Sequence, residues 1–150
     1  MLKNIEIIQV GRDKFDYIKY AKKDFFNRLN HFFSISEIIL KESKLKSVNE
    51  RLLNEEKDIR KYTGNNSKII ILSSEGTKMN SQDFSKFIYK FSSIVFIIGG
   101  SDGLSENIKN SSNYIISLSK MTFPHHIAKI LLIEQLYRAA TIKNHLKYHK

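Results

Sequence analysis

The chain is built around the stretch Ser117-Leu-Ser-Lys-Met-Thr-Phe-Pro-His-His-Ile-Ala-Lys-Ile-Leu-Leu-Ile-Glu-Gln-Leu-Tyr-Arg-Ala139. A short extended segment, Tyr114 to Leu118, leads into it, and a polar turn from Ser119 to Thr122 follows. Pro124, the only proline, suits the start of a helix, because the first helical position needs no backbone N–H. Thr122 or the residues just before it are expected to cap that helix. The stretch therefore predicts a strand, a turn and a helix.

The expected helix, residues 127–140, is apolar on almost every face, and only Lys129, Glu134, Gln135 and Arg138 interrupt it. A helix with this pattern must be covered on more than one side. At about sixteen residues it is too short and too polar to span a bilayer. Two interpretations remain: a core helix buried within one chain, or a helix that packs on its own sheet and on a second subunit.

The rest of the chain alternates between extended and helical patterns. Apolar runs predict strands at residues 2–10, 31–40, 68–72, 93–98 and 114–118. Helical spacing predicts helices at residues 15–29, 47–64, 80–91 and 104–110, the second of them opened by a capping box. This alternation implies an α/β sheet with parallel pairs. The length of 150 residues suits one domain, residues 1–150, with one sizeable core.

Two of these helices carry enough pattern to predict their inward faces. In the first, an apolar stripe from Phe15 to Leu29 is expected to face inward, and the lysines, Lys22 among them, are expected to face away. In the second, Val48 and Tyr62 are expected to belong to the inward face. These assignments follow from residue spacing alone.

The composition narrows the classes of function. The net charge is +10 and the isoelectric point about 9.7, which favours polyanionic partners, nucleic acid first. Compositional drift in an AT-rich genome is an alternative source of part of this charge. The absence of cysteine excludes disulfides, cysteine-ligated metal sites and thiol nucleophiles. Neither a basic leader nor a run of about eighteen apolar residues occurs, so we expect a soluble, cytoplasmic protein with no membrane partner.

Three segments at strand ends could form one site, because ligands of open α/β sheets bind beyond the carboxyl ends of the strands. They are Leu72–Gly76, Ile98–Gly103 and Ser119–Pro124. Glycines there permit close backbone approach and positive φ. The glycine run is neither the dinucleotide fingerprint nor a P-loop. Taken alone, these glycines are equally explained by a tight turn, and the serines of the third segment by capping.

The motifs of the C-terminal third resemble the signature of the small ribosomal RNA methyltransferases called RlmH, members of the SPOUT class. The matching pieces are Ser117-Leu-Ser-Lys-Met-Thr-Phe-Pro-His125, Glu134-Gln-Leu-Tyr-Arg-Ala139 and Tyr148-His149-Lys150. The resemblance covers essentially the whole chain. It implies a SPOUT-type α/β fold with a C-terminal trefoil knot and a mainly parallel sheet flanked by helices. It also implies a homodimer.

The resemblance implies that S-adenosylmethionine is held in a bent shape by the three segments. The implied cofactor-binding residues are Leu72, Gly99, Gly100, Gly103, Ser119, Lys120, Met121, Thr122, Phe123 and Pro124. Relatives often carry an acidic residue where this chain has Ser73, and Ala or Pro where it has Ser101. The implied contacts in the first two segments are therefore backbone contacts rather than particular side-chain roles.

The resemblance also implies which residues serve the chemistry: His125, Arg138, Tyr148 and His149. His125 would accept or relay a proton, or would instead orient or pack. Arg138 would meet phosphate or cofactor carboxylate, although its spacing from Glu134 equally suits an intrahelical ion pair. Tyr148 and His149 would reach the active site of a dimer, whereas a frayed terminus is the default for such a tail. No metal-ligand spacing is visible, and methyl transfer from a sulfonium needs no metal.

By resemblance, the expected activity is methylation of N3 of a pseudouridine in 23S ribosomal RNA, the RNA of the large subunit, within the assembled ribosome. The residues alone specify neither pseudouridine nor N3. One rival is a non-enzymatic ribosome-associated or RNA-binding module of the same fold, which would bind RNA but not S-adenosylmethionine. Another is a SPOUT methylase that acts on free transfer RNA.

Overall fold

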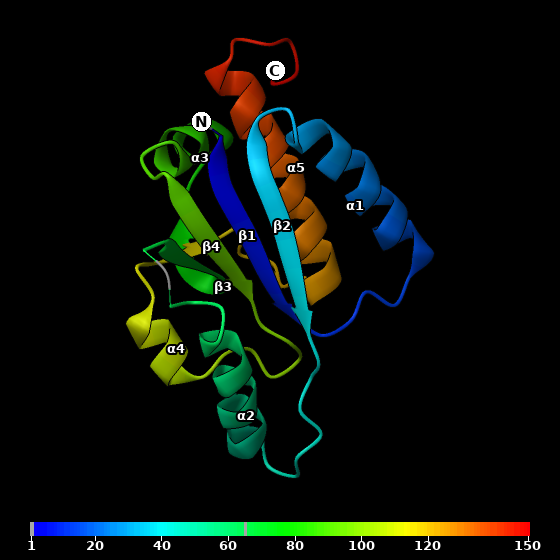
Figure 1. Ribbon diagram of the computed structural model, residues 1–150, viewed down its shortest axis with the longest axis vertical. Coiled ribbons are helices and arrows are strands. Elements are labelled where there is room, and N and C mark those ends of the chain that lie inside the picture. The colour runs from blue at the N-terminus through cyan, green and yellow to red at the C-terminus, as the bar shows by residue number, and fades with distance from the viewer. Residues whose placement is uncertain (1, 65) are drawn as a thin grey trace.

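The computed structural model describes residues 2–64 and 66–150, in which five parallel strands form one sheet in the order β2-β1-β4-β3-β5 (Figure 1). The strands are β1 (Lys3–Val10), β2 (Phe33–Leu40), β3 (Lys68–Lys78), β4 (Ser93–Ile98) and β5 (Tyr114–Ser117). Since all pairs are parallel, the carboxyl ends of the strands share one edge of the sheet. The expected alternation of strands and helices is confirmed.

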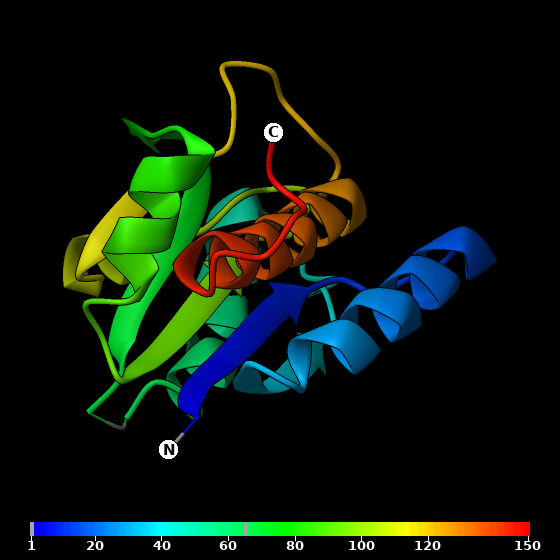
Figure 2. The same cartoon turned by 90° about the horizontal axis from the view of Figure 1, so that it is seen from above.

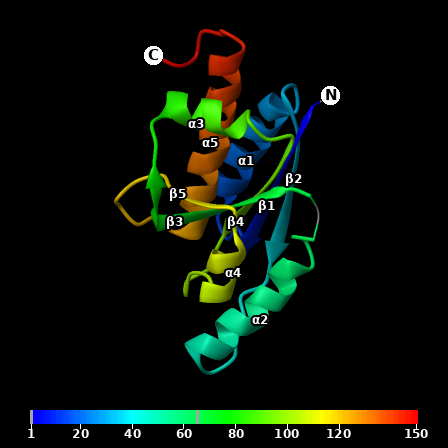
Figure 3. The ribbon, with the colours of Figure 1, turned by 90° about the vertical axis from the view of Figure 1, so that its left-hand side faces the viewer.

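Helices cover both faces of the sheet (Figure 3). One layer holds α1 (Asp16–Leu29), α3 (Ser81–Ile88) and α5 (His125–Lys143), with α5 packed between the other two (Figure 1). The other layer holds α2 (Val48–Arg60) and α4 (Glu106–Ser111). Alternate β4 residues serve the two cores: Phe96 faces the α5 layer, and Ile97 faces the α2 layer. A central strand buried on both faces is apolar throughout for this reason.

Strand β3 runs six residues beyond its predicted end at Leu72, because it contains a bulge. Leu72 and Thr77 both pair with Ile116, and the residues between them lie outside the regular register. A Cβ on Gly76 would lie 2.5 Å from the carbonyl carbon of Ile116, so only glycine fits where the bulge crosses β5. The first predicted site segment is therefore a bulge within a strand rather than a loop after it.

The predicted inward faces are partly wrong. Phe15, Val48 and Tyr62 are 44%, 47% and 40% exposed. Helix α1 begins only at Asp16, and α2 ends at Arg60, so Phe15 and Tyr62 lie beyond the packed turns. The Ser47 capping box of α2 is confirmed. No helix in the described part of the chain has the length and apolarity that crossing a membrane requires.

The start of α5 also differs from expectation. Pro124 is the N-cap rather than the first helical residue, and no side chain caps the helix, so the prediction that Thr122 caps it is wrong. The loop of residues 118–124, which leads into the helix, projects from the body of the molecule (Figure 2). The extended backbone of Pro124, with ψ 150°, turns the chain into the helix instead.

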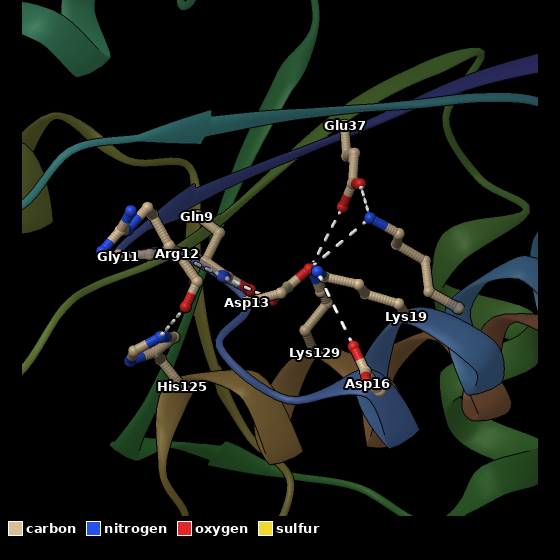
Figure 4. Close-up of polar contacts among 10 residues, drawn as sticks. Gln9, Gly11, Arg12, Asp13, Asp16, Lys19, Glu37, His125 and Lys129 are labelled. Carbon is tan, nitrogen blue, oxygen red and sulfur yellow. Dashed lines mark hydrogen bonds and ion pairs between the residues drawn. The ribbon is translucent and has the colours of Figure 1, made fainter.

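A buried charge cluster fastens α5 to the sheet (Figure 4). Its members are Lys129, Lys22, Asp13 and Glu37. Lys129 has no exposed side-chain surface, and its Nζ pairs with the carboxylates of Asp13 and, at 3.1 Å, Glu37. Lys22 pairs with the same two carboxylates, so it does not face away as predicted. Two cations thus neutralise two anions, as burial of charge requires.

The cluster joins four elements: α5, α1, strand β2 and the loop after β1. The Gln9 side-chain amide strengthens it by donating hydrogen bonds to Asp13 Oδ1 at 3.0 Å and to the Gly11 carbonyl at 2.6 Å. Burial alone would raise the pKa of Asp13, but hydrogen bonds from Lys129 and Gln9, with the charges of both lysines, hold that pKa below its ordinary value. The β1–α1 loop is thereby fixed against the first turns of α5.

We predict that Lys129→Met destabilises the protein by about 3 kcal/mol, because two largely buried carboxylates would share one remaining cation. Adding Asp13→Asn should recover part of this loss, because Lys22 and Glu37 then remain as a neutral pair. Chemical denaturation of the single and double variants measures both effects. Lys19→Met is the matched control, because the Lys19–Asp16 pair is exposed and its loss should cost less than about 0.5 kcal/mol. Strictly additive losses in the double variant would contradict the coupling.

The lowered pKa of Asp13 predicts a pH dependence of stability. The unfolded chain holds the Asp13 proton more tightly than the folded one. The stabilisation that ionised Asp13 provides is therefore fully present above about pH 4, the ordinary pKa of an aspartate. It is lost as the pH falls through the lower pKa that Asp13 has in the folded state. Asp13→Asn should lower the thermal midpoint at pH 7 and flatten its decline between pH 5 and pH 3. Melting curves across this range test it, with the exposed Asp24→Asn as control. An unchanged acid decline in Asp13→Asn would refute the assignment.

Candidate functional site

A pocket of about 350 Å³ lies at the carboxyl ends of β3, β4 and β5. All three predicted segments contribute to its wall, together with the start of α5. Of the ten residues expected to bind a cofactor, eight line it: Leu72, Gly99, Gly100, Gly103, Ser119, Met121, Thr122 and Phe123. Lys120 and Pro124 are not among the lining residues. The structure therefore brings the three segments together in one pocket wall, and their binding of a cofactor stays a prediction.

The glycine run after β4 forms a tight turn in the pocket wall. Gly103 N–H donates to the Gly100 carbonyl at 3.0 Å, and Gly103 has a φ of 77°, which glycine adopts without strain. A Cβ on Gly99 would lie 2.6 Å from the Gly103 carbonyl oxygen. A Cβ on Gly100 would meet the Glu42 carboxylate at 2.5 Å. Gly99 and Gly103 are thus required by the turn itself, whether or not a ligand is bound, whereas a larger residue at Gly100 would displace the Glu42 side chain.

Two side chains outside the predicted segments hold this turn in place. Glu42, just after β2, accepts a hydrogen bond from Ser101 N–H at 2.8 Å. Arg51 of α2 pairs with Asp102 at 2.7 Å, and this hydrogen bond lowers the pKa of Asp102. Sequence reasoning missed Glu42 and Arg51, because nothing in their local sequence indicates partners that lie 59 and 51 residues away.

The third segment, Ser119–Pro124, lies in the loop of residues 118–124, which is shaped by hydrogen bonds of Ser117 and Ser119. Ser117 Oγ donates to the Ser119 carbonyl at 2.7 Å, and Ser119 Oγ accepts from Met121 N–H at 3.0 Å. Met121 is 73% exposed at the rim of the pocket. The serine hydroxyls therefore organise the loop rather than cap α5.

His125 lines the pocket, whereas His126 is absent from its lining. The ring Nε2 of His125 lies 3.4 Å from the Arg12 carbonyl oxygen (Figure 4). Gly11 has a φ of 101°, and a Cβ there would lie 2.9 Å from His125 Cε1, so the ring packs where only glycine leaves room. Burial and the neighbouring His125 lower the pKa of His126, whose ring lies 5.2 Å from that of Phe15. The loop fixed by the charge cluster thus supports the pocket histidine.

Arg138, Tyr148 and His149 lie together, but outside the pocket wall. Arg138 pairs with Glu134 at 2.6 Å, as the i,i+4 spacing indicated, and its Nη1 lies 3.3 Å from His149 Nδ1. The Tyr148 hydroxyl donates to Glu134 Oε1 at 3.1 Å. Burial and Glu134 raise the pKa of Tyr148, which keeps the phenol protonated. These contacts hold the tail against α5, so the tail is not frayed.

A helix-ending turn directs the tail back along α5. Leu146 N–H donates to the Thr141 carbonyl at 2.9 Å, and His145 N–H donates to the Ile142 carbonyl at 3.2 Å. His145 itself takes a φ of 54°, the left-handed conformation of a Schellman motif. The carboxyl-terminal end of α5 and the tail lie far from the start of the helix at the pocket (Figure 1). One chain therefore separates the four expected catalytic residues into two groups.

The arrangement suits the binding of a small molecule beside a histidine. The pocket volume falls within the range of about 300–1,000 Å³ that is typical of ligand sites. Its wall combines backbone from three segments with apolar side chains such as Leu72 and Phe123. Among residues 2–64 and 66–150, no group of three or more His, Asp or Glu side chains is placed to hold a metal ion.

Comparison with known proteins gives a family and a fold. A family model described as "Predicted SPOUT methyltransferase" matches residues 3–149. Two relatives bear the name "Ribosomal RNA large subunit methyltransferase H". The protein from Dictyoglomus thermophilum is 42% identical over 97% of this chain and 99% of its own length. The protein from Fusobacterium nucleatum is 41% identical over 98% of this chain and 99% of its own.

A solved structure supports the fold independently. It is titled "The structure of a probable methylase family protein from Haemophilus influenzae Rd KW20", and it matches with a TM-score of 0.60 at 16% identity. The match covers 100% of this chain and 72% of that one. The family model and the two relatives span nearly the whole sequence, and this structure has the same fold. The chain belongs to the SPOUT methyltransferase family.

Proposed function

We propose that the chain is an S-adenosylmethionine-dependent methyltransferase that methylates N3 of a pseudouridine in large-subunit ribosomal RNA. We further propose that residues 1–150 act as a single domain, as a homodimer, on the assembled ribosome in the cytoplasm. The observation that carries this proposal is the ligand-sized pocket at the three strand ends. The name shared by the relatives, ribosomal RNA large subunit methyltransferase H, supports the substrate class.

The pocket fits the cofactor by its chemistry. An adenosyl group needs an apolar surface against the faces of the purine ring and backbone N–H and C=O groups that hydrogen-bond to the polar edge of that ring. The wall offers Leu72 and Phe123 beside the backbone of the glycine turn and of the 118–124 loop. The Gly103 turn and the β3 bulge bring backbone to the pocket in conformations that bulky residues would strain. The trefoil knot that these segments are expected to form stays a prediction.

When bound, S-adenosylmethionine supplies an electrophilic methyl group on a sulfonium. The protein has to place the acceptor nitrogen in line with that methyl and to remove the N3 proton. Positioned by the Arg12 carbonyl, His125 is the pocket residue suited to receive that proton. A neutral imidazole has one donor and one acceptor nitrogen, and the Arg12 carbonyl would favour the tautomer in which Nε2 is the donor. We propose His125 for this role.

A homodimer would unite the two separated groups of expected catalytic residues. The tail and Arg138 do not line the pocket of their own chain. Half-buried apolar side chains of α5, among them Ile130, Leu131 and Tyr137, are left for a further partner. A second copy packed on α5 would cover them and could bring Tyr148 and His149 to the neighbouring pocket. The isologous contact of a twofold dimer would complete both sites at once.

We predict that Thr122→Trp abolishes methylation by filling the pocket mouth. Thr122 is exposed, lines the pocket and has no side-chain hydrogen bond among the described residues, so the fold should persist. Labelled S-adenosylmethionine and large subunits or ribosomes lacking the modification provide the assay, and nucleoside mass spectrometry identifies the product. The parent should yield N3-methylpseudouridine, and calorimetry should show at least tenfold weaker cofactor binding by Thr122→Trp.

Lys90→Trp is the matched control, because this exposed residue lies in the turn before β4, at the amino ends of the strands. It should behave like the parent in both measurements. Binding of ribosomes without any methyl transfer by the parent protein would favour the non-enzymatic module. Methylation of free transfer RNA instead of ribosomes would favour the other SPOUT substrate class.

The tail is predicted to act on the partner's pocket. Deleting Tyr148 to Lys150 should leave cofactor affinity nearly unchanged and reduce turnover by about a hundredfold, the scale of lost substrate positioning. A heterodimer of the tail-deleted subunit with a Thr122→Trp subunit should regain activity, because one pocket then has both a working cofactor site and an intact tail. Action in cis leaves neither pocket complete, so an inactive heterodimer would contradict the prediction. A monomer at micromolar concentration by light scattering would do so as well.

A further inference from the structure

A second pocket, of about 450 Å³, lies beside the first and is lined mainly by basic residues. The loop after β1 contributes Gly11, Arg12 and Lys14, and the loop after β2 contributes Lys41, Glu42 and Lys44. The two loops begin side by side, because β1 and β2 are paired to their ends and Gly11 N–H donates to the Leu40 carbonyl at 2.8 Å. Parallel pairing therefore brings together four cations from sequence segments about thirty residues apart.

These four cations have no ion-pair partner among the described residues, and all four are exposed. Lysines elsewhere in the chain, such as Lys61 and Lys109, pair with nearby acids. The single acid in this pocket, Glu42, already accepts the Ser101 N–H. A solvated face with random lysines would mix both signs, whereas this surface concentrates positive potential in a concave region.

The basic pocket adjoins the pocket histidine through shared residues. The Arg12 side chain lines the basic pocket, while the Arg12 carbonyl faces His125 Nε2 at 3.4 Å. Glu42 lines the basic pocket and also contacts Gly100, which lines the other. The charge cluster fixes this loop through Asp13, so the spacing between the cations and His125 is built into the fold. The β1–α1 loop lies between the basic pocket and His125. A ligand that occupied both pockets would therefore have its anionic groups on one side of this loop and His125 on the other.

We propose that Arg12, Lys14, Lys41 and Lys44 bind backbone phosphates of the RNA substrate beside the target nucleotide. This inference rests on the proposed RNA methylation. A methylated nucleotide must leave its stack to reach the first pocket, and the phosphates on either side must follow it to within a few ångströms of the protein. Lysine meets phosphate as a point charge and arginine as a planar fork, and neither contact reads the base sequence. The subsite supplies register and affinity, and the first pocket supplies the chemistry.

The test compares two double variants with the same charge change. Lys41→Gln/Lys44→Gln removes the half of the subsite that does not adjoin His125. Lys57→Gln/Lys90→Gln removes two exposed lysines, from α2 and from the turn before β4, that have no ion-pair partner among the described residues. Binding to large ribosomal subunits that lack the modification is measured across salt concentrations. Methyl transfer to the same subunits gives KM and kcat, and calorimetry gives the affinity for S-adenosylmethionine.

Each phosphate contact that is lost should reduce the slope of log Kobs against log salt by roughly 0.7–0.9. Lys41→Gln/Lys44→Gln should therefore flatten the slope by about 1.5, weaken subunit binding about tenfold and raise KM while kcat and cofactor affinity stay near the parent values. The control pair should change the slope by less than half as much. These readings come from RNA binding, so they remain informative even if the parent transfers no methyl group.

Three results would overturn the proposal. Equal effects of the two double variants would make the charge a diffuse steering field rather than a subsite. Parent-like binding by Lys41→Gln/Lys44→Gln would remove the pocket from the RNA contact surface. Weakened S-adenosylmethionine binding by that variant would assign the cations to the carboxylate of the cofactor instead of to RNA phosphate. A parent protein that binds subunits with a steep slope but never methylates them would defeat the proposed function and leave the phosphate contact standing.

Discussion

The pairing of Lys129 with Asp13 and Glu37 is the interaction on which the geometry of the site depends. Burying the Lys129 ammonium group without a counter-charge would cost a large amount of free energy. Helix α5 therefore packs where the Asp13 and Glu37 carboxylates pair with this group. Those carboxylates come from the β1–α1 loop and from β2, which the parallel pairing of β1 and β2 already holds in register. One contact thus relates the long helix, the sheet edge and the loop that supports His125. The position of His125 in the pocket wall therefore depends on the pairing of Lys129 with Asp13 and Glu37.

Around that frame, carboxylates fix the glycine turn of the pocket wall and the carboxyl-terminal tail. Glu42 and the Arg51–Asp102 pair hold the glycine turn, while Glu134 holds the tail through Arg138 and Tyr148. In a chain with 25 basic and 15 acidic residues, several of the fewer acids have specific structural roles. Among residues 2–64 and 66–150, many of the other basic side chains have no ion-pair partner, which favours the binding of a polyanion. If the proposed RNA contact is right, stability and nucleic-acid affinity depend on different charged residues.

The sequence was sufficient for features that depend on local pattern. Apolar runs located the five strands, the Ser47 box located α2, and the strand-end rule located the pocket, because each follows from a few consecutive residues.

The sequence was insufficient where the position of a side chain depends on partners that are distant in the chain. Lys22 looked solvent-facing because its two anions are nine and fifteen residues away, and Lys129 looked like an interruption of an apolar helix. A lysine inside such a helix was nevertheless a signal that buried anions had to exist. The tail with Tyr148 and His149 was expected near an active site, but only the structure shows that it packs on α5, against Glu134 and Arg138.

The three walls of the pocket differ in the contacts that hold them in place. The β3 bulge is anchored at both ends by pairing with Ile116, and the glycine turn is held by Glu42 and Arg51. The 118–124 loop has side-chain hydrogen bonds only to itself and to Ser117, and it projects from the body of the molecule (Figure 2). Local opening takes place where few contacts must be broken. We therefore expect this loop to open more readily than the other two walls, and we expect the rate of its opening to limit how fast ligands enter and leave.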